Sequence, residues 1–71
     1  MEIVFTSHAE ERVKTRKISK EEVLEALKFP TTVIKKYDLY YYQRIIDQRG
    51  MIEVVVDKTE KNIKIITVYW I

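Results

Sequence analysis

The sequence predicts a small α+β domain in which two helices precede an antiparallel sheet and pack on one of its faces. Two helix-capping patterns follow one another near the N-terminus, and alternating, β-branched segments fill the rest of the chain. Helices first and strands afterwards are typical of a two-layer α+β arrangement. The 71 residues allow a single domain, residues 1–71.

Each N-terminal element has its own local signal. Residues 2–6 alternate and indicate a short first strand. Ser7 and Glu10 have the spacing of a capping box, with Ser7 as the N-cap of a helix that ends near residue 17. The second capping box begins at Ser19. Its helix ends near residue 29, because Pro30 disfavours helical geometry in the residue before it.

Four β-branched segments follow, at residues 31–37, 40–47, 51–57 and 63–70. Their connections are short enough for hairpins, so we expect a four-stranded antiparallel meander. In the last strand, simple alternation places Ile66, Val68 and Trp70 opposite Ile63, Ile65 and Tyr69. Two short helices can cover only one face. Either strand curvature folds the remainder into the core, or an exposed face binds a partner.

Composition excludes several classes of site. The chain has no cysteine, so disulfides and thiolate zinc sites are out. His8 is the only histidine and Gly50 the only glycine, which argues against imidazole metal sites and glycine-rich phosphate loops. We therefore expect neither a metal nor a cofactor. No apolar run approaches the roughly 18–20 residues of a membrane span, and no signal-peptide pattern is present, so a cytoplasmic protein is expected.

Three polar residues form a stripe on the first helix. His8, Arg12 and Arg16 follow at intervals of four, at the edge of the face that should be buried. The start of a helix favours anions and disfavours the imidazolium, which would help to keep His8 neutral and able to act as a base. The same spacing also fits an ordinary solvated helix face that pairs with nearby carboxylates.

Aromatic residues suggest a second surface. Tyr40 and Tyr42 share one strand face with Arg44, an arrangement that could stack bases and hold a phosphate. Alternatively, these tyrosines are ordinary strand residues whose hydroxyls reach water. Trp70 is expected to be an anchor in the core or at an interface.

The N-terminal half carries a resemblance to a known family. Residues 6–12 read T-S-H-A-E-E-R, Arg16 follows, and residues 17–23 read K-I-S-K-E-E-V, with Leu27 and Pro30 beyond; residues 66–69 read I-T-V-Y. This resembles the prokaryotic domain-of-unknown-function family numbered 4258, itself similar to the BrnT and RelE toxins of type II toxin–antitoxin systems. Many members have a glycine where this chain has Lys17.

The resemblance implies a RelE/barnase-like fold and metal-independent cleavage of RNA, free or on the ribosome, by attack of the 2′-hydroxyl. The motif's polar positions fall on His8, Arg12 and Arg16, and Arg44 would complete the catalytic set. RNA-binding positions would be Lys17, Tyr40 and Tyr42. Tyr69 and Trp70 would face an antitoxin protein or a second copy of the chain. A second proton-transfer group is less obvious; the candidates are Tyr42, Tyr69 and Glu53.

Two interpretations without catalysis remain open. The chain could be a homodimeric interaction module of the same fold, with the helix stripe serving only as a charged surface. It could also be a nucleic-acid-binding sheet that uses its tyrosines and Arg44 without chemistry.

Overall fold

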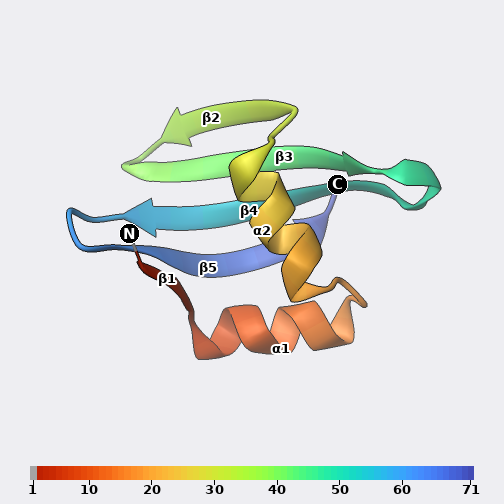
Figure 1. Cartoon of the computed structure of the whole chain (residues 1–71), viewed down its shortest axis with the longest axis horizontal. Coiled ribbons are helices and arrows are strands. Elements are labelled where there is room, and N and C mark those ends of the chain that lie inside the picture. The colour runs from red at the N-terminus through yellow and green to blue at the C-terminus, as the bar shows by residue number, and fades with distance from the viewer. Residues whose placement is uncertain (1) are drawn as a thin grey trace.

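The chain folds around a single β-sheet. The computed structural model describes residues 2–71 and confirms the α+β class, with two helices and a five-stranded sheet in the order β1-β5-β4-β3-β2 (Figure 1). A short 3-10 helix, Asp47–Arg49, joins β3 to β4. The elements are β1 (Glu2–Phe5), α1 (Ser7–Thr15), α2 (Lys20–Lys28), β2 (Thr32–Lys36), β3 (Leu39–Ile46), β4 (Gly50–Lys58) and β5 (Asn62–Trp70).

The sheet is mixed, so the expected four-stranded antiparallel sheet is wrong in that respect. Strands β2 to β5 pair antiparallel with their neighbours, but β1 joins as a fifth strand, parallel to β5, with Ile3 beside Ile63 and Phe5 beside Ile65. A parallel pair needs a long connection, and here both helices and three strands lie between the two partners.

The helices occupy different places on the sheet, rather than both packing on one face as expected. Helix α2 crosses the face formed by β3 and β4, and α1 lies along the sheet edge beside β5 (Figure 1). Because β1 is only four residues long, it pairs with the first half of β5 and leaves the second half to α1. We call the face under α2 the helix face and the opposite one the open face.

A β-bulge in β5 settles which side chains face the core. Val54 pairs with Val68 and Val56 with Ile65, so Ile66 is an extra residue between two regularly paired segments. Simple alternation therefore fails here. Ile63 and Ile65 lie on the helix face together with Val68 and Trp70, and not opposite them. The core is formed by buried residues of that face and of the helices: Ala9, Val13, Ile18, Val23, Ala26, Tyr42, Ile46, Ile52, Val54, Val56, Ile65 and Val68.

The N-caps of the two helices depend on different contacts: that of α2 is purely local, and that of α1 also involves β5. Ser19 and Glu22 form the expected capping box, each side chain accepting from the other's backbone N–H at 3.0 Å. The cap of α1 is Thr6, not Ser7. Its hydroxyl accepts from the N–H of Ala9 at 3.1 Å and donates to the carbonyl of Ile65 in β5 at 2.9 Å. A contact distant in sequence thus selects the capping residue.

Helix α1 ends at Thr15, two residues before the expected position. The N–H of Lys17 bonds the carbonyl of Lys14, and the N–H of Ile18 bonds that of Val13, which is the Schellman arrangement of a helix C-terminus. This arrangement needs a left-handed residue after the cap, and Lys17 has φ 55°. Lys17 therefore lies at a position where the backbone favours glycine.

Candidate functional site

Two long-range contacts hold α1 in place against β5. At its start, Thr6 is bonded to β5 as described above; at its end, the indole N–H of Trp70 donates to the carbonyl of Arg16 at 2.9 Å. Trp70 was expected as an anchor in the core or at a partner interface; it packs against the core, and its N–H is used within the chain. Held at both ends, α1 runs in the same direction as β5 and presents one side to the open face.

The histidine of α1 contacts that face directly. His8 Nε2 lies 3.1 Å from the hydroxyl of Thr67 in β5, and Arg12 Nε donates to the same Nε2 at 3.3 Å. Because a guanidinium can only donate, Nε2 is the acceptor in the contact with Arg12. His8 is exposed and Arg12 half-buried. The structure therefore brings together an exposed imidazole and a fixed positive charge, with Nε2 of the imidazole in contact with both Arg12 and Thr67.

The other basic residues expected on this helix lie further along it. Arg16 is half-buried one turn beyond Arg12, at the C-cap of α1. Lys17 is exposed at the left-handed position that follows. Both therefore add positive charge at the C-terminal end of the helix, where cations are favoured by the helix dipole.

A second set of polar side chains lies on the open face, two residues further along β5 than Thr67. Glu53 of β4 is flanked by its two cross-strand neighbours, Tyr69 of β5 and Gln43 of β3. The hydroxyl of Tyr69 donates to one carboxylate oxygen of Glu53, and the amide of Gln43 donates to the other at 2.7 Å. Burial, together with the Glu53 hydrogen bond and charge, raises the pKa of Tyr69 to about 12.

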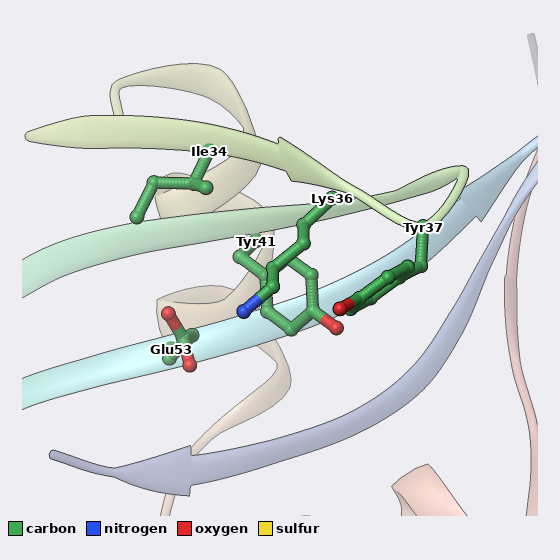
Figure 2. A pocket seen from close by; sticks show the side chains of 5 residues that line it. All are labelled: Ile34, Lys36, Tyr37, Tyr41 and Glu53. Carbon is green, nitrogen blue, oxygen red and sulfur yellow. The ribbon is translucent and has the colours of Figure 1, made fainter.

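A pocket opens next to this carboxylate. It measures about 320 Å³ and is lined by Ile34, Lys36, Tyr37, Tyr41 and Glu53. Figure 2 shows Lys36 extending across Tyr41 toward Glu53, with the ring of Tyr37 beside them. Tyr37 is placed there by a two-residue turn in which Tyr37 and Asp38 both have positive φ, 54° and 64°, as the tight hairpin between β2 and β3 requires.

The predicted Tyr40, Tyr42 and Arg44 set lies on the opposite side of the sheet. Strand alternation groups these three residues correctly, but the register with Val56, Val54 and Ile52 places them on the helix face. Arg44 donates to the carbonyl of Phe29 at 2.7 Å and lies 3.7 Å from Glu25, so it holds the end of α2 and does not join His8.

The two tyrosines differ in accessibility. Tyr42 belongs to the core, with 7% of its surface exposed. Tyr40 lies beside it and is half-buried, with a distance of 6.4 Å between the two ring centroids. The ammonium groups of Lys35 and Lys58 lie 5.4 and 4.4 Å from the centre of the Tyr40 ring. Only Tyr40 of this pair could present a ring to a ligand.

Several residues of the open face were missed by sequence reasoning. Thr67 was noted only as part of the I-T-V-Y segment, and Tyr41 only by alternation, which places it opposite Tyr40 and Tyr42. The others are Gln43 and the pocket residues Ile34, Lys36 and Tyr37. Thr67 could not be identified as the neighbour of His8, because that contact depends on α1 lying at the sheet edge. Of the three candidates for a second proton-transfer group, Tyr69 and Glu53 share the open face with His8, whereas Tyr42 does not.

Comparison with known proteins identifies the family. The family model described as "Domain of unknown function (DUF4258)" matches residues 5–70. The chain belongs to this family. The match includes both helices, the bulged last strand and every residue of the site described above. Comparisons with curated proteins and with solved structures gave no match.

Two further properties of the described residues bear on the site. Within residues 2–71, no group of three or more histidine, aspartate or glutamate side chains is arranged to hold a metal ion. No helix in the same range has both the length and the apolar character needed to cross a membrane.

Proposed function

We propose that this DUF4258 member is a metal-independent ribonuclease, similar in type to the RelE and BrnT toxins, that cleaves RNA by attack of the 2′-hydroxyl. The observation that carries the proposal is the contact set of His8, Arg12 and Thr67. It places an exposed imidazole and a phosphate-binding cation side by side, beside an open sheet face that could carry the RNA strand. No metal or cofactor has a part in this proposal.

The reaction assigns a role to each group. Bound RNA displaces the contacts that Arg12 and Thr67 make with Nε2 of His8. Nε2 then accepts the proton of the 2′-hydroxyl while the 2′-oxygen forms a bond to phosphorus and the bond to the 5′-oxygen breaks. Arg12 balances the charge that develops on the phosphorane oxygens, with Arg16 adding positive charge one turn away. The products are a 2′,3′-cyclic phosphate and a 5′-hydroxyl, with the latter's proton supplied by water.

Water takes this last role because neither open-face candidate is suited to it. The hydroxyl of Tyr69 donates to Glu53, and both oxygens of Glu53 accept hydrogen bonds within the sheet. Both side chains are therefore engaged with one another and not with the contact set at His8. An enzyme with one imidazole and no matched acid is slow, so we expect low turnover on free RNA.

A protein partner on the open face is part of the proposal. Ile34 and Ile45 of that face are 43% and 54% exposed, and Tyr69 lies between them and α1. An antitoxin or a second copy of the chain that covered them would also cover His8, which would restrain a cytoplasmic ribonuclease.

A non-catalytic interaction module is the second candidate, and one observation favours it. All five residues of the edge strand β2 are exposed, including Val33 and Ile34. An exposed edge with apolar side chains is suited to pairing with another strand. On this alternative the His8 contacts are only structural.

Cleavage of a labelled RNA in EDTA separates the two candidates. The wild-type protein should cut the RNA, and His8→Ala and Arg12→Ala should each lose most of that activity. Lys14→Ala removes an exposed positive charge from the same helix and should cut normally. Equal cleavage by wild type and His8→Ala would point to a contaminating nuclease. No cleavage by the wild type, free or with ribosomes, would favour the interaction module.

A further inference from the structure

The open-face pocket lies within reach of a nucleic acid strand bound at His8. Thr67, which contacts His8, pairs with Val55, and Val55 pairs with Tyr41 in the pocket wall. Neighbouring strands lie about 4.8 Å apart, so Tyr41 is about 10 Å from Thr67 across the sheet. A single strand of RNA that crossed the face would place a base near the pocket and a phosphate near Arg12.

The hydrogen bonds already made by Glu53 define what it can still accept. A carboxylate has about four acceptor positions, two on each oxygen. Tyr69 occupies one position on one oxygen, and Gln43 occupies one on the other. The carboxylate is therefore held from both sides, and each of its oxygens keeps one acceptor position for an N–H group of a ligand.

The rest of the pocket supplies complementary groups. Lys36 is a hydrogen-bond donor whose side chain points toward Glu53. The rings of Tyr41 and Tyr37 and the apolar side chain of Ile34 offer surfaces on which a flat ligand could stack. The Lys36 ammonium also offsets the negative charge of Glu53, which would otherwise repel a polyanion.

We infer that this pocket is a guanine-binding subsite. Guanine is the RNA base whose Watson–Crick edge carries two adjacent N–H donors, on N1 and N2, beside the O6 acceptor. The two donors match the free positions of Glu53, and O6 matches Lys36. Adenine, cytosine and uracil each place an acceptor where Glu53 needs a donor. Tyr41 stacks on the base, as aromatic residues do in single-strand recognition.

The inference deepens the proposed function, because it supposes that RNA crosses this face. Its test is therefore a binding measurement that needs no cleavage. Short 2′-deoxy oligonucleotides carry no 2′-hydroxyl and cannot be cut by the proposed reaction. Four labelled tetramers, with dG, dA, dC or dT at one position of a common sequence, are titrated with the protein and followed by fluorescence anisotropy.

The dG tetramer should bind at least fivefold more tightly than the other three. Glu53→Gln keeps the shape of the side chain but replaces one acceptor oxygen by a donor, and it should abolish this preference. Tyr41→Ala should weaken binding of every tetramer by about tenfold. Tyr40→Ala is the matched control, since Tyr40 is the neighbouring tyrosine of β3 on the opposite face, and it should leave the dG preference intact.

Equal binding of the four tetramers, or a preference that survives Glu53→Gln in a folded variant, overturns the inference. These outcomes are distinguishable from failure of the ribonuclease proposal. RNA cleavage without base preference leaves the ribonuclease standing and removes the subsite. If the protein prefers dG but cuts no RNA, the subsite stands, and the protein is a guanine-selective binder without ribonuclease activity.

Discussion

Replacing Lys17 by glycine should stabilise the protein. Lys17 follows the end of α1 with φ 55°, in the left-handed region that side chains with a Cβ disfavour. The Schellman hydrogen bonds from Lys17 and Ile18 hold it there. Its side chain is exposed, so glycine removes no packed surface. The change therefore acts almost entirely through the backbone.

Two opposing effects set the magnitude. The left-handed conformation costs a non-glycine residue about 1–2 kcal/mol. Glycine increases the entropy of the unfolded chain, which costs about 0.4–1 kcal/mol. We therefore expect Lys17→Gly to raise the free energy of unfolding by about 0.5–1 kcal/mol. For a domain of this size, that corresponds to a rise in Tm of about 2–8 °C.

Urea denaturation of Lys17→Gly beside Lys17→Ala measures the effect. The alanine variant removes the same charge but keeps a Cβ in the left-handed position, so its stability should stay close to that of the wild type. A glycine variant no more stable than the alanine variant would refute the reasoning. Both variants also lack the Lys17 charge, so any role of Lys17 in RNA affinity should affect them equally.

Two further predictions concern the caps and the tyrosine of the open face. Thr6→Ala and Ser19→Ala should each lower the free energy of unfolding by about 1 kcal/mol. Ser7→Ala should change it by less than about 0.5 kcal/mol, and a larger loss for Ser7 would contradict the assigned cap. The raised pKa of Tyr69, about 12 against an ordinary 10, favours its protonated form in the folded state. The shift therefore adds to the free energy of unfolding below pH 10, and this stabilisation is lost as the pH rises toward 12. Tyr69→Phe should therefore remove the highest-pH step in a phenolate absorbance titration; an unchanged titration curve would show that another tyrosine carries it.

The local elements could be predicted from the sequence because their signals are local. The capping box at Ser19 depends on two residues three apart, and both halves of it are present. At the first helix the capping-box spacing pointed to Ser7, whereas the observed cap, Thr6, also bonds the carbonyl of Ile65, which is distant in sequence. Alternation likewise fails only where the bulge at Ile66 adds a residue to β5.

The candidate site was predictable in part for the same reason. The four-residue spacing of His8 and Arg12 is a property of one helix, and the structure confirms that their side chains meet. Alternation also groups Arg44 correctly with Tyr40 and Tyr42. Which face of the sheet α2 covers is a tertiary choice with no local signal, so the sequence could not show that Arg44 and His8 are on opposite sides.

The central claim is that His8 activates a 2′-hydroxyl for attack on phosphorus. The most direct test uses DNA oligonucleotides that contain a single ribonucleotide, incubated with purified protein in EDTA. One cut is expected, on the 3′ side of the ribonucleotide; it leaves a 2′,3′-cyclic phosphate and a 5′-hydroxyl and is absent with His8→Ala. Cleavage of an all-deoxy control, or equal cleavage by His8→Ala, would contradict this claim.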